Sequence, residues 1–208
     1  MPDYSIVGTS DFSLSATPSS RTIAQNTYNT YSVTVSPQGG FNGVVTFATS
    51  GLPAGATATF NPTSITGSGT ASMQISCAGW TAPGNYTVTI TGTSGSIQHT
   101  TTVLLSVTGF SISVTPTSRT VTRGSSTTYT ATLLDQNGYS ATKTMSVTGL
   151  PNGATATFSP SSLSGSGTST LTVKTSGGTP KGTRTLTIKA TSSVGSLYHT
   201  ATVSLTVQ

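Results

Sequence analysis

Very few residues of this 208-residue chain could act as acids, bases or metal ligands. The sequence holds no Glu, three Asp and two His, against 34 Ser and 47 Thr. The acids are Asp3, Asp11 and Asp135. A glycosidase of the usual kind needs two placed carboxylates, and a zinc site needs three or four converging ligands. We therefore expect no catalytic residue, no metal site and no cofactor, and the chain is predicted not to be an enzyme.

The two histidines occupy equivalent places, His99 in "SIQHTTTV" and His199 in "SLYHTATV". A Ser-His-Asp triad would need an acid beside each ring. Two of the acids lie near the N-terminus and the third lies in the other half of the chain from His99. His99 is in phase with Val103 and Leu105, so we expect it to pack at the edge of a core with a backbone partner.

The elements that position these residues are duplicated. The string "GLPAGATATFNPTSITGSGT" at 51–70 returns as "GLPNGATATFSPSSLSGSGT" at 149–168, an offset of 98 residues. Self-similarity at a fixed offset is typical of tandem domains. The sequence predicts an N-terminal extension or linker at 1–10, one domain at 11–108 and a second domain at 109–208.

Each copy is predicted to contain about seven short strands with Gly and Pro turns between them. Alternation is clean in the sixth strand, where Tyr86, Val88 and Ile90 share one face and three Thr residues share the other. Thr suits the wet face of a sheet, because it is β-branched and polar. In the first copy the strands are expected near 11–15 (continuing at 21–25), 28–36, 43–50, 55–60, 69–77, 85–93 and 97–107.

Seven antiparallel strands in about 100 residues indicate an immunoglobulin-like β-sandwich. The chain is thus predicted to be all-β, with two such sandwiches in tandem. Tyr86 lies two residues before the inward Val88, which is the position of a tyrosine corner. The second copy has Arg184 in place of this tyrosine.

The string "DFSLSATPSSRTIAQ…GLPAGATATFNPTSITGSGTASMQI…PGNYTVTITGTSGSIQHTTTVLLSV" resembles the bacterial Ig-like repeats of large secreted and cell-surface proteins. The resemblance covers nearly the whole chain. It implies a non-catalytic extracellular spacer, stalk or adhesion module, in a surface protein that could assemble with itself. It carries over no catalytic or ligand-binding residue, since one fold hosts many functions.

The alternative is a carbohydrate- or cell-wall-binding accessory module of a secreted enzyme. Trp80, in the loop "CAGWTAPG", could stack on a sugar ring or could cover the end of its own sandwich, and we favour the second. Three tyrosines are predicted to be exposed and available for contact: Tyr28, Tyr139 and Tyr198. Cys77 is in phase with Met73 and Ile75, so it is expected to be a small buried hydrophobe.

The segment "DYSI" at residues 3–6 echoes "DFSL" eight residues later. It is either the remnant of a linker or an added strand, with Tyr4 and Ile6, that pairs with a neighbouring subunit.

Positive charge is concentrated in the second copy, and the formal net charge is +5. The basic residues do not cluster, so they are predicted to form a solvated face and not a nucleic-acid site. No long apolar run and no signal peptide are present, so we expect no membrane insertion. The expected partners are proteins or polysaccharides at the cell surface, or neighbouring copies of the chain, in an extracellular location. The first copy has Arg21 alone, and the second has Arg119, Arg123, Lys143, Lys174, Lys181, Arg184 and Lys189.

Overall fold

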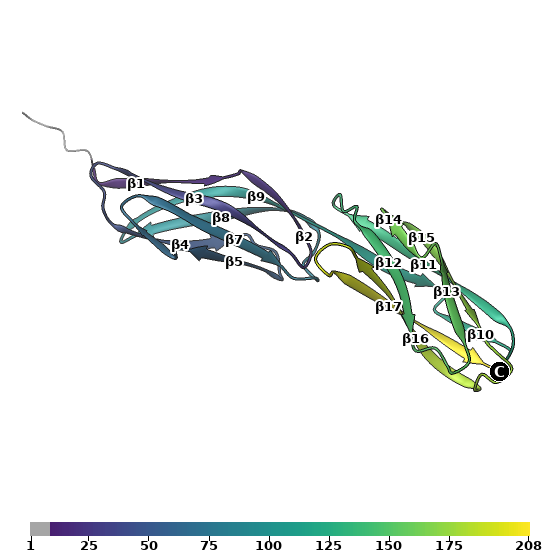
Figure 1. Ribbon diagram of the computed structural model, residues 1–208. Coiled ribbons are helices and arrows are strands. Elements are labelled where there is room, and N and C mark those ends of the chain that lie inside the picture. The colour runs from purple at the N-terminus through teal and green to yellow at the C-terminus, as the bar shows by residue number, and fades with distance from the viewer. Residues whose placement is uncertain (1–8) are drawn as a thin grey trace, which may run out of the picture. The chain divides into compact units, whose positions relative to one another are not determined.

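The computed structural model describes residues 9–208, which form two compact all-β units. Unit 1 ends at Val107 and unit 2 begins at Thr108. Strand β9 (Ile97–Thr115) contributes to both, because its first part pairs with β8 and its last part pairs with β11. Figure 1 labels the strands of each unit except the short β6 (Ser64–Thr66).

Unit 1 is a sandwich of two sheets. One sheet has the strand order β1-β3-β7-β5, and in the other β9-β8-β4-β6 run side by side while β2 pairs with β9. The pairs whose registers are given are antiparallel, such as β3 with β7. The strands are β1 (Asp11–Thr17), β2 (Ser20–Ala24), β3 (Tyr28–Gln38), β4 (Val44–Ser50), β5 (Ala56–Asn61), β6 (Ser64–Thr66), β7 (Gly69–Cys77) and β8 (Gly84–Ser94).

Unit 2 repeats this topology strand for strand. One sheet has the order β13-β15-β11-β9 and the other has β10-β17-β16-β12-β14, with β10 parallel to β17. The tandem Ig-like fold predicted from the sequence is therefore confirmed. The strands are β10 (Ser118–Val121), β11 (Ser126–Gln136), β12 (Thr142–Thr148), β13 (Thr155–Ser159), β14 (Ser162–Ser164), β15 (Gly167–Lys174), β16 (Gly182–Ser192) and β17 (Tyr198–Val207).

Alternating side chains produce the two cores. In unit 1, Val88 and Ile90 of β8 and Val103 and Leu105 of the neighbouring β9 lie inward, and all four are at most 2% exposed. The threonines between them face outward or are partly covered. Apolar burial of this kind is the dominant stabilising term in folding.

The structure has more strands than the seven expected in each copy. The first predicted strand divides into β1 and β2, which lie in different sheets, and Pro18, which has no N–H to donate, lies between them. The short strand β6, which the sequence reading assigned to a turn, pairs with β4.

Tyrosine hydroxyl groups tie distant strands together at equivalent places. Tyr31 donates to the carbonyl of Leu104 at 2.9 Å, and Tyr129 donates to that of Ser204 at 2.8 Å. Burial raises the pKa of Tyr31 to about 12. The predicted tyrosine corner is also present, since the Tyr86 hydroxyl donates to the Ala82 carbonyl at 2.8 Å.

Candidate functional site

The most unusual polar feature of the described residues is a buried ion pair in unit 2. Lys143 is the second residue of β12 and is in phase with the buried Met145, so its side chain enters the core and is 0% exposed. Its Nζ contacts the carboxylate of Asp135, whose side chain is 8% exposed. Asp135 is in phase with the buried Leu133 near the end of β11, which places both charged groups on inward positions.

Two aromatic rings stand beside the Lys143 amine. The Nζ atom lies 5.7 Å from the ring centroid of Phe110 and 5.6 Å from that of Tyr139. Both distances fall within the range of cation–π attraction. The rings and the carboxylate together offset the large cost of removing a charged amine from water.

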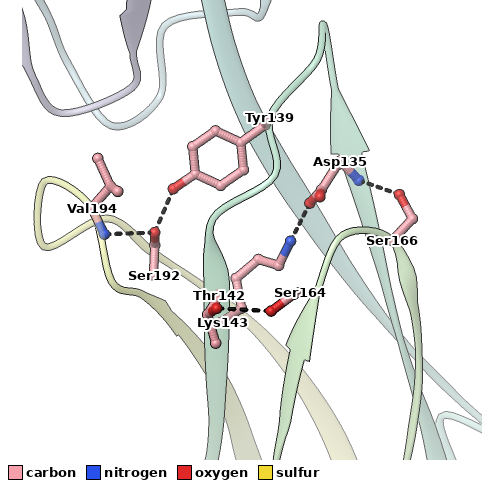
Figure 2. A network of polar contacts seen from close by, with 8 residues as sticks. All are labelled: Asp135, Tyr139, Thr142, Lys143, Ser164, Ser166, Ser192 and Val194. Atoms are coloured by element: carbon pink, nitrogen blue, oxygen red, sulfur yellow. Dashed lines mark hydrogen bonds and ion pairs between the residues drawn. The ribbon is translucent and has the colours of Figure 1, made fainter.

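One hydrogen bond links Asp135 to a neighbouring serine, and a separate group of hydrogen bonds starts from Tyr139 (Figure 2). The backbone N–H of Asp135 donates to Ser166 Oγ at 2.8 Å, and the Tyr139 hydroxyl contacts Ser192 Oγ, which accepts the N–H of Val194 at 3.0 Å. Among the described residues, no hydrogen-bond partner reaches Asp135 Oδ2, which is buried.

A lysine amine can serve as a nucleophile or base when it is neutral and reachable. Lys143 is not reachable, because its side chain is 0% exposed and its Nζ atom contacts a carboxylate inside the core. We therefore interpret the pair as a structural contact. The prediction that the basic residues form a solvated face is wrong for Lys143, because its strand phase directs it inward.

The first copy has no such pair. With the offset of 98 residues, Val45 stands at the place of Lys143 and Pro37 at the place of Asp135. Val45 is fully buried and belongs to an apolar cluster with Phe12 and Phe41. The same fold therefore tolerates either an apolar or an ionic filling at this end of the sandwich.

Unit 1 has a different polar contact, between His99 and Asp11. Its Nε2 lies 2.7 Å from Asp11 Oδ1, and its ring meets Phe12 edge-on at 4.8 Å. The hydrogen bond with His99 is the main cause that lowers the pKa of Asp11, followed by the N–H of Phe12. The expected backbone partner of His99 is thus replaced by a carboxylate, which folding brings from 88 residues away.

His199 repeats the edge-on ring contact without the acid. Its ring lies 4.8 Å from that of Phe110, while Gly109 stands where the first copy has Asp11. Burial lowers the pKa of His199 below its ordinary value of 6.5. The two histidines therefore occupy equivalent places in different electrostatic surroundings.

We expect the stability of unit 2 to fall as the pH drops below about 6.5, the ordinary pKa of histidine. The unfolded chain binds a proton more readily than the folded chain, so acid favours unfolding through this group. The contribution of neutral His199 to stability is complete above pH 6.5. It is lost as the pH falls from that value through the lowered pKa of His199 in the folded chain. Urea unfolding of wild type and His199→Gln at about pH 7.5 and about pH 5 measures this. Equal pH dependence in both proteins would contradict the assignment.

The residues predicted to contact a ligand differ in their exposure. Trp80 is 69% exposed, Tyr28 is 65% exposed and Tyr198 is 55% exposed. The prediction that Tyr139 is exposed is wrong, since it is 7% exposed and stacks on Phe110 at 5.8 Å. Its inward position comes from the turn that follows β11, where its N–H donates to the Gln136 carbonyl.

Two of these exposed rings, those of Trp80 and Tyr198, contact other residues of their own unit. The Trp80 ring lies over Gly55, where an added Cβ would come within 3.0 Å of it, so the ring partly covers its own unit while most of its surface stays open. Lys189 Nζ lies 4.1 Å from the centroid of Tyr198. Tyr4 and Ile6, the predicted pairing strand, lie outside the described residues.

The thiol of Cys77 is the remaining group with possible chemistry in the described part. Cys77 is buried as predicted, and burial raises the pKa of its thiol. Within residues 9–208, no group of three or more His, Cys, Asp or Glu is placed to hold a metal ion. No helix in this part is long and apolar enough to span a membrane.

No protein-family model matches the chain, and no curated protein matches it. Among solved structures, it is similar to domains 4 and 5 of the S-layer protein SbsC, with 27% identity and a TM-score of 0.38 over 61% of this chain and 66% of that one. It is also similar to the I-band fragment I67-I69 of titin, with 12% identity and a TM-score of 0.38 over 94% of this chain and 65% of that one.

An endo-fucoidan hydrolase of glycoside hydrolase family 107 is a third similar structure, with 15% identity and a TM-score of 0.38. The match covers 94% of this chain but 29% of the hydrolase. The chain therefore spans less than two thirds of these proteins. Structural neighbours thus include tandem Ig-like domains of a bacterial surface protein and of titin, and the fold assignment itself comes from the strand order and register described above.

Proposed function

We propose that the chain is a non-catalytic spacer module of an extracellular or cell-surface protein, and that it carries tension between its two ends. The extracellular location is supported by the resemblance of its sequence to Ig-like repeats of secreted and surface proteins. The duplication supports a spacer, because two units of one topology add length without adding a new site. Its partners would be surface proteins, polysaccharides or further copies of the chain.

The pairing of β10 with β17 carries the proposal. These strands come from the beginning and the end of unit 2, yet they run parallel, with Ser118 opposite Ser204 and Val121 opposite Val207. A pull on the beginning of β10 and the end of β17 therefore slides the strands along each other. All bonds between the strands are then loaded together, whereas a peeling force would break them singly.

Backbone hydrogen bonds define this ladder. Ser204 donates its N–H to Thr117 at 2.8 Å, Gln208 donates to Val121 at 3.0 Å, and Arg123 donates to Gln208 at 3.1 Å. Unit 1 has the equivalent of the first bond, since Leu104 donates to Ser19 at 2.8 Å and β2 pairs with β9. Both units thus connect an early strand to their last strand.

The engagement of the ionisable groups supports a non-catalytic role. Asp11 is bonded to His99 and Asp135 is paired with Lys143, so two of the three acids are used in structural contacts. The ring of His199 packs edge-on against Phe110. Both acids of the described residues are therefore engaged with a neighbouring side chain.

Pulling single molecules of the full chain from end to end tests the proposal. We expect two separate rupture events, each releasing about 330–360 Å of contour length, because each unit holds about 100 residues at roughly 3.3–3.6 Å per residue. Extension without distinct rupture events would contradict a load-bearing role.

A second function, binding of polysaccharide, is favoured by one observation, the 69% exposure of Trp80. Aromatic rings of this kind present an apolar face together with a polar N–H. Binding to a polysaccharide panel that is lost in Trp80→Ala, with unchanged unfolding, would support it. Unit 2 supplies an internal comparison, because Gly178 stands at the place of Trp80. Binding that survives the substitution would count against this function.

A further inference from the structure

The loss of the tyrosine corner in unit 2 coincides with a pocket. A pocket of about 360 Å³ is lined mainly by Leu150, Pro151, Asn152, Pro180 and Arg184. Arg184 stands where the first copy has Tyr86, and Pro180 stands where it has Ala82.

In unit 1 the equivalent space is used by a tyrosine side chain. Tyr86 packs with Leu52 against the core, and its hydroxyl donates to the Ala82 carbonyl at 2.8 Å. Leu150 is the counterpart of Leu52. The pocket of unit 2 therefore combines apolar side chains, Leu150, Pro151 and Pro180, with polar groups, and it has a guanidinium group where the sister unit has a phenol ring.

The positive charge of Arg184 places a second requirement on any group that binds in this pocket. Arg184 is exposed, and Asp135, the single acid of the second copy, contacts Lys143 inside the core. No side-chain carboxylate of unit 2 is thus left to meet the guanidinium group. An occupant with a carboxylate beside an aromatic ring would satisfy both features, since arginine binds carboxylates with paired N–H donors.

The chain itself contains two such pairs of adjacent residues, Asp3-Tyr4 and Asp11-Phe12. The second is already engaged, because Asp11 is bonded to His99 and Phe12 is 1% exposed. We propose that the Arg184 pocket of one molecule takes Asp3 and Tyr4 of a second copy. The carboxylate of Asp3 then meets the guanidinium group, and the ring of Tyr4 packs on Leu150, Pro151 and Pro180.

This contact joins two different surfaces of the same chain. Such a head-to-tail contact can repeat from copy to copy, and it builds an open row wherever the rotation between successive copies does not close a ring. One small pocket gives a weak association, which becomes significant where many copies stand close together. The inference goes beyond the load-bearing role, and the pulling experiment on single molecules does not depend on it.

Sedimentation velocity of the full chain over a wide range of concentration tests the proposal. Wild type should associate, and the peptide PDYSI (residues 2–6) should compete. Arg184→Gln should weaken association by about tenfold, the loss expected for a hydrogen bond to a charged group. Lys181→Gln is the matched control, because it removes the same charge from an exposed residue outside the pocket lining, and it should leave association unchanged.

Arg184→Tyr separates loss of the pocket from loss of folding. It restores the residue of the first copy, so it should close the pocket, abolish association and leave unit 2 at least as stable in urea. Asp3→Asn with Tyr4→Ala should likewise abolish association. A wild-type chain that stays monomeric at every concentration would overturn the proposal, as would association that survives Arg184→Tyr.

Discussion

Asp135→Asn is expected to lower the free energy of unfolding of unit 2 by about 3–5 kcal/mol, the usual cost of removing one partner of a buried ion pair. The reason is the position of Lys143, which is 0% exposed, so that its amine is left in the core without its ionic partner when the carboxylate is gone. The two aromatic rings near its Nζ atom offset only part of this cost.

The double substitution Lys143→Met with Asp135→Leu provides the matched comparison. It removes both charges and fills the space with apolar atoms, as Val45 and Phe41 do in unit 1. Replacing a buried pair by apolar residues is often neutral or stabilising, so we expect most of the lost stability to return. A double variant as unstable as Asp135→Asn would show that shape, and not the unpaired charge, causes the loss.

Urea unfolding shows which unit is destabilised by Asp135→Asn. Trp80 is the single tryptophan and lies in unit 1, so its fluorescence follows that unit, while circular dichroism follows the strands of both. The fluorescence transition should be the same in all variants. A shift of that transition would contradict the assignment of the change to unit 2.

Gly149→Ala is expected to cost unit 2 about 3–4 kcal/mol, among the larger effects of a single substitution. The residue has φ +86°, and an added Cβ would lie 2.3 Å from the backbone carbonyl oxygen of Thr185. Thr185 belongs to β16 and pairs with Ser204 of β17, so its carbonyl cannot move aside without disturbing that pairing. Gly51 makes the same approach to Thr87 in unit 1, at φ +82° and 2.3 Å.

Gly165 supplies the control for backbone conformation. Its φ is +82°, but an added Cβ there would meet nothing within 4 Å. Gly165→Ala should therefore cost only the left-handed penalty of about 1–2 kcal/mol. Chemical denaturation gives the free energy of unfolding of both variants. The difference between Gly149→Ala and Gly165→Ala is the cost of the steric clash at Gly149. Equal losses of stability would show that conformation alone accounts for the effect of Gly149→Ala.

Most of the fold could be predicted because it follows from local patterns in the sequence. The alternation through Tyr86, Val88 and Ile90 follows from the two-residue period of a strand, and the offset of 98 residues shows that the pattern occurs twice. The division of the first strand into β1 and β2 was less accessible, because pairing with β3 or with β9 is decided by distant partners.

The polar contacts were predicted less well, for two different reasons. His99 and Asp11 lie 88 residues apart, and no local pattern links them. The pair of Lys143 and Asp135 did leave a signal, since both residues are in phase with the inward faces of their strands. Lysine and aspartate are so rarely buried that their types suggested a solvated face, and their phase was the better guide.

The direction of pulling tests the load-bearing role most directly. Handles at the two ends of the chain slide β10 along β17, whereas handles at Gly124 and Gln208 separate the same strands from one end, because both residues follow the paired segments at that end. We predict that unit 2 ruptures at a several-fold higher force when its strands slide than when they peel. Equal rupture forces in the two directions would contradict the account.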